Sequence, residues 1–428
     1  MPTDTISRYA LSNGLRVILC HRPLTPLAAV SVHYGVGFRS EPEGRGGFAH
    51  LFEHLMFQGS ANVARSEHFR IVQSSGGTAN GSTRQDYTEY YQIAPASALE
   101  RLLFLEADRM RAPRFTGEAL ATQMSVVKEE IRLNVHDRAY GGFPWTALPS
   151  ALYQKFSNAH NGYGDFTDLA RATPDDCAAF FDAYYTPSNA VLTVAGALDP
   201  ERTRTWVDRH FGDIPPRTAA AAQDLGEPHP SATVRHEHTD PHAPLPATAL
   251  GYRLPDAAAD RDGYLAHMVL AHLLAGDGPG SLRHRARDAG VQLAALAAQC
   301  GFFGPFDARA PDTFVVSARH PAPSDELLQE LTRGALDELA ADGTLPRELA
   351  DTTGRLAARW RRTHGNLLAR TRALGAYHLL HDDAGLVDSV PGRLTAIGPA
   401  AVRAAAAALG ESAPAVLAVR PGTAAVAA

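Results

Sequence analysis

Cysteine and tryptophan are scarce in this sequence, with three residues of each in 428. Cys20, Cys177 and Cys300 lie far apart in the chain. A disulfide framework or a thiolate zinc site needs several cysteines at short spacings, so the sequence predicts neither. We expect each cysteine to be a small core residue and the protein to work in a reducing cytoplasm.

Long apolar runs and an excess of one charge are missing as well. No apolar stretch approaches the roughly 18 residues that a membrane-spanning helix needs. The first 15 residues lack the basic and apolar regions of a signal peptide. A formal net charge of −6 gives no electrostatic case for nucleic acid or for an anionic membrane. We therefore predict that neither is a partner.

The chain does contain enough apolar material for two domains. Hydrophobic residues make up 45% and charged residues 20%, which is normal for a globular protein. A chain of 428 residues exceeds one ordinary core. Proline and alanine are frequent before residue 233, which indicates a linker. We predict domains over residues 1–218 and 233–428, joined by the linker 219–232.

Local patterns predict several elements in the first half. We expect a hairpin over 9–20, strands over 28–36, 78–92 and 190–195, and helices over 96–112 and 118–137. Ser66 and Thr173 are predicted helix N-caps. In the second half the order restarts with a strand near 246, a helix over 261–275, a further strand, helices over 325–341 and 347–380, and a strand over 414–419. This restart indicates an internal duplication.

The most informative stretch, residues 46–60, contains His50, Glu53 and His54 in the order H-x-x-E-H. Residues four apart on a helix lie one above the other, so both imidazoles can bind one Zn²⁺. Glu53 can lean over the metal without binding it, where the general base for a water belongs. The surrounding residues are apolar nearly all round, which predicts a buried helix. Buried histidines need partners, and a metal supplies them.

A catalytic zinc usually takes three protein ligands, so we searched for a third. The helix predicted over 118–137 has one apolar face, formed by Leu120, Met124, Val127 and Ile131. Glu130 flanks this face at roughly 90°, whereas Glu129 points to the opposite side. Glu130 is therefore the better-placed ligand, and Glu129 is predicted to be a solvated surface charge.

These features resemble the pitrilysin/insulinase family of zinc peptidases, the inverzincins, and in particular its short bacterial, processing-peptidase-like branch. In that family a ligand glutamate follows H-x-x-E-H by some 76 residues, and here 130 − 54 = 76. The stretches that carry the resemblance are LSNGLRVILCHR (11–22), GVGFRSEPEGRGGFAHLFEHLMFQGS (35–60), GGTANGSTRQDYTEYY (76–91) and YYTPSNAVLTVAGALDP (184–200).

The resemblance implies an α+β fold of two homologous sandwich domains, each a mostly antiparallel sheet with helices on one face. It implies a zinc metalloendopeptidase in which extended peptides add a strand to a sheet edge at Asn80, Gly81 and Ser82. The alternative for Asn80 is an ordinary turn residue. Relatives often carry a glutamate seven residues before the ligand glutamate; here that position is Gln123, which we expect to lie in the second shell.

The second half departs from the family pattern. Relatives carry an arginine and, seven residues later, a tyrosine, which contact the substrate and the developing oxyanion. Here Leu293 stands where the tyrosine should be. We therefore expect a heterodimer with a homologous chain that lacks H-x-x-E-H and carries the arginine and tyrosine. The alternative is a homodimer that uses Arg283, Arg285 or Arg287 with another donor.

Two other functions are alternatives to peptide hydrolysis. A non-catalytic scaffold subunit, as found among relatives in respiratory complexes, typically loses the zinc motif, which is present here. A metal-dependent binding protein would not need Glu53. We expect the remaining histidines to be structural: His160 in a loop, the set from His229 to His242 in a surface connection, and His267 and His272 on a helix.

Overall fold

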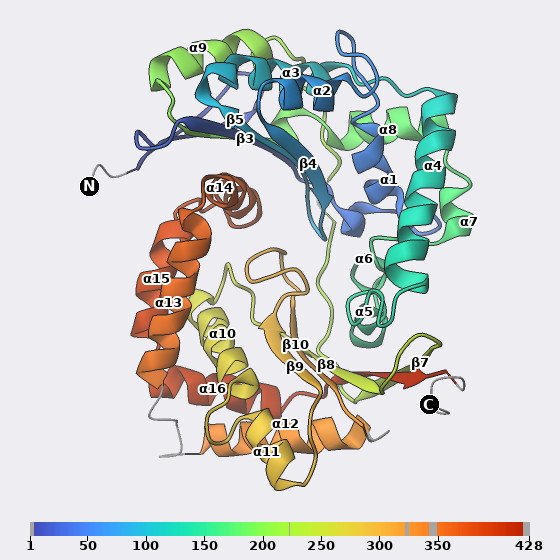
Figure 1. Cartoon of the computed structure of the whole chain (residues 1–428), viewed down its shortest axis with the longest axis vertical. Helices are drawn as coiled ribbons and strands as arrows, with labels where there is room; N and C mark the ends of the chain where they lie inside the picture. Colours follow the sequence, from blue (N-terminus) through green and yellow to red (C-terminus); the bar gives the residue numbers. More distant parts are fainter. Residues whose placement is uncertain (1–3, 222, 322–324, 342–348, 423–428) are drawn as a thin grey trace. The chain divides into compact units, whose positions relative to one another are not determined.

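The computed structural model of the protein describes residues 4–221, 223–321, 325–341 and 349–422. The chain forms two compact units (Figure 1). Unit 1 comprises Met1–Lys128, Gly162–Gln223 and Arg362–Val387, and unit 2 comprises Glu129–Asn161, Asp224–Arg361 and Asp388–Ala428.

Unit 1 is built on a six-stranded sheet in the order β1-β2-β6-β3-β5-β4. Its strands are β1 (Thr5–Ala10), β2 (Arg16–His21), β3 (Leu27–Tyr34), β4 (Thr78–Thr83), β5 (Thr88–Pro95) and β6 (Ala190–Gly196). Only β2 and β6 pair in parallel, and the other neighbours pair antiparallel. The expected hairpin over 9–20 is confirmed as β1–β2. β4 is an edge strand, so one side of its backbone has no neighbouring strand in this sheet.

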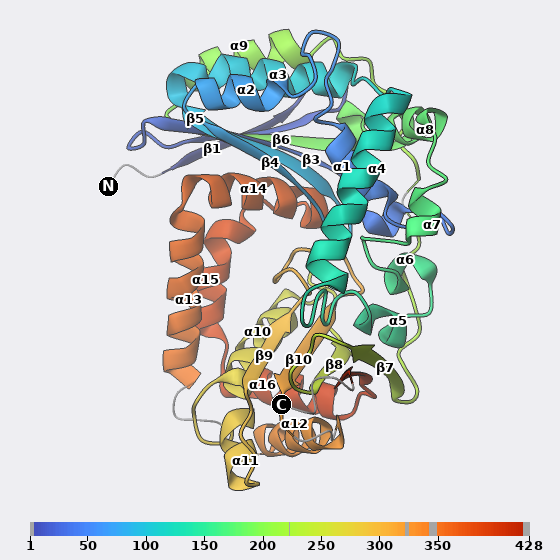
Figure 2. The ribbon, with the colours of Figure 1, turned by 45° about the vertical axis from the view of Figure 1, so that its right-hand side comes forward.

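Helices cover both faces of this sheet (Figures 1 and 2). α2 (Glu67–Ser74), α3 (Leu99–Arg111) and α9 (Pro200–Phe211) lie over one face. α14 (Leu367–His381) lies against β3 and β6 on the other. α1 (Phe48–Leu55) packs beside β4, and α4 (Gly117–Ile131) and α8 (Pro174–Tyr184) complete the larger helices. Thr173 and Asp176 form the capping box at the start of α8, which confirms the predicted N-cap.

Unit 2 repeats the strand order with one edge strand fewer. Its sheet runs β7-β11-β8-β10-β9, with one parallel pair, β7–β11. The strands are β7 (Val234–Asp240), β8 (Ala247–Arg253), β9 (Ala295–Cys300), β10 (Thr313–Arg319) and β11 (Ala415–Pro421). Apart from β1, the two sheets have the same topology, so the predicted duplication of an α+β unit with a mostly antiparallel sheet is confirmed.

The helices of unit 2 also lie on both faces of its sheet. α10 (Arg261–Ala275) contacts β9, α12 (Asp325–Ala340) contacts β8, and α16 (Pro399–Gly410) packs on both helices. The opposite face is covered by α5 (Leu148–Leu152), whose Leu148 and Leu152 pack against Ala249, Val315 and Leu417. The other helices are α11 (Leu282–Asp288), α13 (Leu349–Gly365) and α15 (Leu386–Ala396).

Each compact unit contains segments from both halves of the sequence, so the units do not divide at the expected boundaries, residues 218 and 233. Helix α5 belongs to the first half of the sequence but packs on the sheet of unit 2. Helix α14 belongs to the second half but packs on the sheet of unit 1. Each sheet thus has one face covered by a helix from the other half, because helices on a single face would leave its second face open to water.

Charged contacts fasten α14 to the first sheet. Arg372 of α14 pairs with Glu89 of β5, with its Nε atom 3.1 Å and 3.0 Å from the two carboxylate oxygens. His33 of β3 approaches the same carboxylate at 3.1 Å. Glu89 is 1% exposed and His33 is fully buried. Burial alone would raise the pKa of Glu89, but His33 and Arg372 outweigh it and lower that pKa to about 2.

Several local expectations need correction. The strand expected over 78–92 is a hairpin, β4–β5, because the chain turns at Arg84–Tyr87, where the Arg84 amide donates to the Tyr87 carbonyl at 2.8 Å. The helix expected over 118–137 ends at Ile131 and continues as a π-helical turn over Arg132–His136. Ser66 makes no side-chain cap on α2, since its backbone has a φ of 62°.

Two further corrections concern the second half. The helix expected over 347–380 begins within residues outside the described ranges and is then broken into α13 and α14, because Asn366 caps a new helix through the Ala369 amide. The connection expected over His229–His242 contains the edge strand β7, which includes His236 and His238. This exposed edge strand is polar at nearly every position, so it lacks the alternation of apolar and polar residues that predicts a strand.

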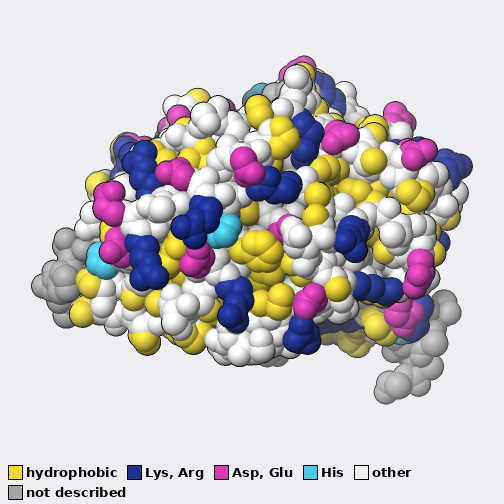
Figure 3. All heavy atoms as spheres, turned by 90° about the horizontal axis from the view of Figure 1, so that it is seen from above, with side chains coloured by type: hydrophobic (Ala, Val, Ile, Leu, Met, Phe, Trp, Pro, Cys, Tyr) yellow, Lys and Arg dark blue, Asp and Glu magenta, His cyan; other side chains and the backbone are white. Residues whose placement is uncertain are grey.

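The absences noted in the sequence have their counterparts in the structure. All three cysteines are free and buried, as expected. Among the described helices, none is long and apolar enough to span a bilayer. On the face seen in Figure 3, basic and acidic side chains are interspersed rather than gathered by sign. That mixture agrees with the small net charge.

Candidate metal centre

The start of helix α1 is held by a buried carboxylate. Glu41, 1% exposed, accepts hydrogen bonds from the Gly47 amide at 2.9 Å and from the Ala49 amide at 2.7 Å. The amides of a helix N-terminus lack partners within the helix, and a negative charge there is favourable. Gly47 has a φ of 85°, and a Cβ at this position would meet the Tyr163 carbonyl oxygen at 2.5 Å. Glu41 and Gly47 together fix where α1 begins.

Helix α1 presents a polar stripe in an otherwise apolar setting. Its buried residues are Phe48, Ala49, Leu51, Phe52 and Leu55. His50, Glu53 and His54 are the three less buried positions. The helix is therefore buried except along the face that carries H-x-x-E-H, as residues three and four apart require.

Three side chains converge where the sequence predicts a metal. His50, His54 and Glu130 each offer a ligand atom, and these atoms all lie within 4.8 Å of one another. The two imidazole rings are 5.0 Å apart and nearly perpendicular. His54 and Glu130 are half-buried. Two imidazole nitrogens and one carboxylate form a donor set typical of catalytic zinc, so these residues fit that metal.

The neighbouring glutamate lies elsewhere. Glu129 is exposed, and its carboxylate pairs with Arg132 at 2.6 Å. The hydrogen bond from Arg132 lowers the pKa of Glu129. Along α4 the predicted apolar face is confirmed, since Leu120, Val127 and Ile131 are buried and Met124 is half-buried. The structure thus brings Glu130, not Glu129, to the histidines.

Glu53 lies against the edge strand. The Thr83 hydroxyl donates a hydrogen bond of 2.7 Å to its Oε2. A Cβ added at Gly81 would meet its Oε1 at 2.9 Å. Glu53 is outside the group of three converging ligand atoms. It shares the polar stripe of α1 with His50 and His54, and its carboxylate lies against β4.

The predicted substrate-binding residues all lie in β4. Asn80, Gly81 and Ser82 pair antiparallel with Tyr91, Tyr90 and Glu89 of β5. Asn80 is exposed and extended in the strand, so the alternative of a turn residue is wrong. Its side chain accepts from the Gly81 amide at 2.9 Å. Their contact with a peptide stays a prediction.

Other expectations near the centre have mixed outcomes. Gln123 lies on α4 and is 8% exposed, and its predicted second-shell role stays a prediction. His160 is not among the converging ligands; its ring stacks on Phe156 at 4.2 Å and approaches the Phe156 carbonyl at 2.6 Å. Tyr163, by contrast, places its ring 5.4 Å from that of His50.

Sequence reasoning missed Glu41, Thr83 and the direct contact of Tyr163. Glu41 lies six residues before the helix it caps, and no periodic pattern marks such a contact. Thr83 lies three residues beyond Asn80 at the end of the edge strand, 30 positions from its partner Glu53. The stretches 35–60 and 76–91 contain Glu41 and Thr83, and Tyr163 lies outside both. Neither stretch indicates the role of an individual residue.

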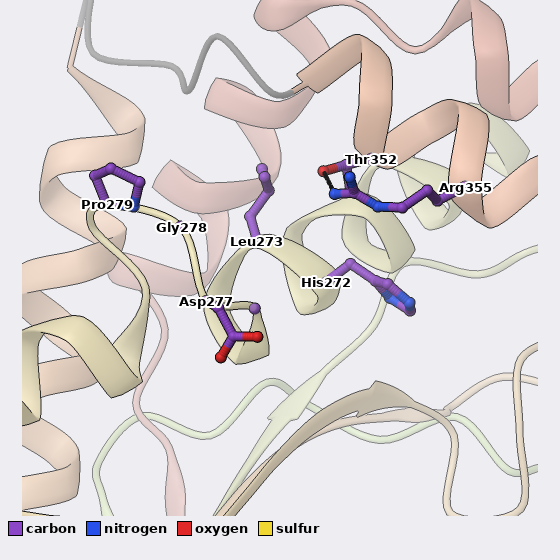
Figure 4. A pocket seen from close by; sticks show the side chains of 8 residues that line it. His272, Leu273, Asp277, Gly278, Pro279, Thr352 and Arg355 are labelled. Atoms are coloured by element: carbon purple, nitrogen blue, oxygen red, sulfur yellow. Dashed lines mark hydrogen bonds between the residues drawn. The ribbon is translucent and has the colours of Figure 1, made fainter.

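Among the described residues, no second group of histidines, cysteines or acids converges in this way. His267 is buried and bonds the Gly263 carbonyl at 2.7 Å, which agrees with a packing role. His272 lines a pocket of about 520 Å³ together with the loop Gly276–Pro279, Thr352 and Arg355 (Figure 4). Arg355 donates to the Thr352 hydroxyl at 3.1 Å. Asp277 is the one acidic residue among those that line this pocket.

Comparison with known proteins agrees with this geometry. The sequence signature described as "Insulinase (Peptidase family M16)" matches residues 16–156. The signature described as "Peptidase M16 inactive domain" matches residues 171–349. The two matches follow one another along the chain, and the first contains every residue of the candidate centre. The chain belongs to peptidase family M16.

Named M16 relatives match over part of their length. The zinc protease PqqE of Helicobacter pylori is 30% identical over 252 residues, which is 57% of this chain and 56% of that protein. The uncharacterized zinc protease YmxG of Bacillus subtilis is 27% identical over 235 residues, covering 55% and 57%. The aligned stretch is therefore little more than half of each of these relatives.

Solved M16 structures share the fold over the whole chain. A protease from Helicobacter pylori superposes with a TM-score of 0.87 at 22% identity, covering 98% of this chain and all of that one. A putative M16-like peptidase from Alicyclobacillus acidocaldarius has a TM-score of 0.82 at 20% identity, covering 99% of each. At these identities the likeness establishes the fold of two repeated α+β units.

Proposed function

We propose that this M16 chain is a zinc metalloendopeptidase that hydrolyses extended peptides. The observation that carries the proposal is the convergence of His50, His54 and Glu130, with Glu53 beside them and outside the ligand set. A non-catalytic chain has no need to retain an acid next to three metal ligands.

The three converging side chains would hold the zinc ion through two nitrogens and one carboxylate oxygen. When bound, zinc supplies Lewis acidity, which lowers the pKa of a water and polarises the scissile carbonyl. Glu53 takes the proton from the attacking water and later gives it to the leaving amine. The carboxylate is suited to both steps because it stands at the edge of the donor set and is fixed to β4 by Thr83.

The substrate we propose is an unfolded peptide bound as an added strand. β4 is an edge strand, and its outer backbone groups can pair with a peptide without disturbing the sheet. Glu53 lies directly against this strand at Gly81. A peptide bound along Asn80, Gly81 and Ser82 is therefore brought to the base. The role that follows is the processing of peptides in the cytoplasm, of which trimming of a leader segment is one form.

The partner we propose is a homologous chain that supplies an arginine and a tyrosine and completes a chamber. In unit 2 the position expected for the tyrosine is Leu293, which is 5% exposed and cannot donate a hydrogen bond. Arg285 pairs with Glu338, and Arg283 lies 3.5 Å from Asp277. Loss of such oxyanion donors costs roughly 3–4 kcal/mol each in transition-state stabilisation.

The experiment measures zinc content and cleavage of a quenched peptide for this chain alone, then with the neighbouring homologue expected in the same genome. We expect about one zinc per chain and strong activity only in the mixture. Full activity of the isolated chain, with a mass near twice 45.8 kDa, would replace the heterodimer with a homodimer. Zinc without hydrolysis in either sample would favour a scaffold.

A further inference from the structure

The end of strand β4 makes a specific contact with the proposed base. Thr83 is its last residue, and its hydroxyl donates to Oε2 of Glu53 at 2.7 Å. Gly81 lies two residues earlier, so its Cα faces the same side of the strand. A Cβ at Gly81 would meet Oε1 of Glu53 at 2.9 Å, so the carboxylate lies close to the backbone here. The carboxylate therefore lies along the strand from Gly81 to Thr83.

Such a contact restricts a side chain that has several rotatable bonds. A glutamate has three rotatable side-chain bonds, and its terminal torsion is broad. Threonine is branched at Cβ and stiff at χ1, so its hydroxyl is a well-placed donor. A hydrogen bond to a carboxylate is shorter and stronger than one between neutral groups. The bond thus favours one orientation of Glu53.

We infer that Thr83 is a positioning residue for the peptidase reaction: its hydroxyl holds the Glu53 carboxylate in the plane from which it takes a proton. The inference rests on the proposed function. It adds that the strand proposed to bind the peptide also orients the base, so one rigid element sets the distance between the scissile bond and Glu53. Misplacement of a catalytic group by about 1 Å can cost roughly 100-fold in rate.

The kinetic test compares three variants in the zinc-loaded protein with its partner chain present. Thr83→Val keeps the shape and removes the hydroxyl, and we expect kcat to fall by roughly 10- to 100-fold with KM within about threefold. Thr83→Ser keeps the hydroxyl and should recover kcat to within about threefold of the unmodified protein. Thr239→Val, at an exposed position of strand β7, is the control, and it should leave both constants unchanged.

The outcomes separate positioning from simple support of the strand. An unchanged kcat in Thr83→Val, or an equal loss in Thr83→Ser, would overturn the inference. A rise in KM with an unchanged kcat would assign Thr83 to peptide binding and would also overturn the inference. Zinc content is measured for each variant, and an equal zinc content in all of them is part of the expected result.

A second measurement does not depend on activity. In metal-free protein, Thr83→Val should lower the melting temperature when Glu53 is present and lower it less in the Glu53→Ala background. Equal shifts in both backgrounds would show that the two side chains do not interact. If the unmodified chain hydrolyses no peptide, the proposed function fails. The comparison of melting temperatures in the two backgrounds still decides whether Thr83 holds Glu53.

Discussion

The two units have one topology and different chemistry. In unit 1 the segment between β3 and β4 contains α1, whose polar stripe holds His50, Glu53 and His54. In unit 2 the corresponding segment between β8 and β9 contains α10, where nine of fifteen residues are buried and the histidines are five apart. Five residues turn a helix by roughly 500°, so His267 and His272 cannot face one metal.

This difference shows that the M16 scaffold does not by itself make a metal site. The strand order, the single parallel pair and the helix layer recur in both units. Among its described residues, the segment between β8 and β9 does not bring histidines and an acid together as α1 and α4 do. The candidate metal centre thus depends on a few side chains of helices α1 and α4, and changes to those side chains test the comparison most sharply.

The largest expected effect follows from removing the base. Glu53→Gln should lower kcat by roughly 100- to 10,000-fold, because an amide cannot accept a proton from water at neutral pH. Zinc content and fold should not change, since Glu53 is not among the converging ligands. His272→Gln, in the corresponding helix of unit 2, is the control and should keep full activity. Loss of zinc in Glu53→Gln would instead make Glu53 a ligand.

The next effect distinguishes two adjacent glutamates. Glu130→Gln should weaken zinc binding by more than about 100-fold, which is the upper end for loss of an outer-shell partner. Glu129→Gln should change it little, because Glu129 is exposed and pairs with Arg132. Competition with a chelator measures both affinities. Equal affinities in the two variants would contradict the assignment of Glu130.

A third prediction concerns helix α14, which comes from the second half of the sequence and packs on the sheet of unit 1. Glu89→Gln should destabilise the metal-free protein by roughly 3–5 kcal/mol, because it leaves His33 and Arg372 without their buried carboxylate. Denaturant unfolding at pH 7 measures this loss. Glu237→Gln, which removes an exposed pair with Arg420 in unit 2, should cost less than about 1 kcal/mol.

The contacts of Glu89 with His33 and Arg372 predict that the free energy of unfolding depends on pH. The pKa of Glu89 is lowered in the folded state to about 2, so its contribution is present above the unfolded value and disappears as pH falls toward 2. The difference in unfolding free energy between the unmodified protein and Glu89→Gln should therefore narrow between about pH 4.5 and pH 2. A difference that stays constant over this range would exclude the charged pair as its cause.

The smallest expected effect is at Gln123. Gln123→Glu adds a negative charge on α4 two turns before Glu130, and it should tighten zinc or leave the affinity unchanged. Chelator competition again gives the affinity. A large loss of zinc would show that this position, 8% exposed, cannot accept a charge.

Sequence reasoning succeeded where the signal is local or periodic. The spacing of His50 and His54 on one helix, and the flank position of Glu130 on another, follow from 3.6 residues per turn. The N-cap at Thr173 and the hairpin β1–β2 could also be predicted, because their signals are local. These signals depend on residues close together in the chain.

The features that were missed depend on contacts across the chain. Helix α14 binds the first sheet through Arg372 and Glu89, 283 positions apart, and no local pattern encodes that pairing. Glu41, Thr83 and Tyr163 act on α1 from three different segments. The strand β7 lacks the alternation of apolar residues that would have predicted it, since five of its seven residues are exposed.

The most direct test of the central claim is the position of the zinc ion in a crystal of the zinc-loaded protein, from anomalous diffraction at the zinc edge. We predict one peak per chain, bounded by His50, His54 and Glu130, with Glu53 beside it and outside bonding distance. A peak at another cluster, such as the histidines of β7, or no peak in unit 1, would contradict the account.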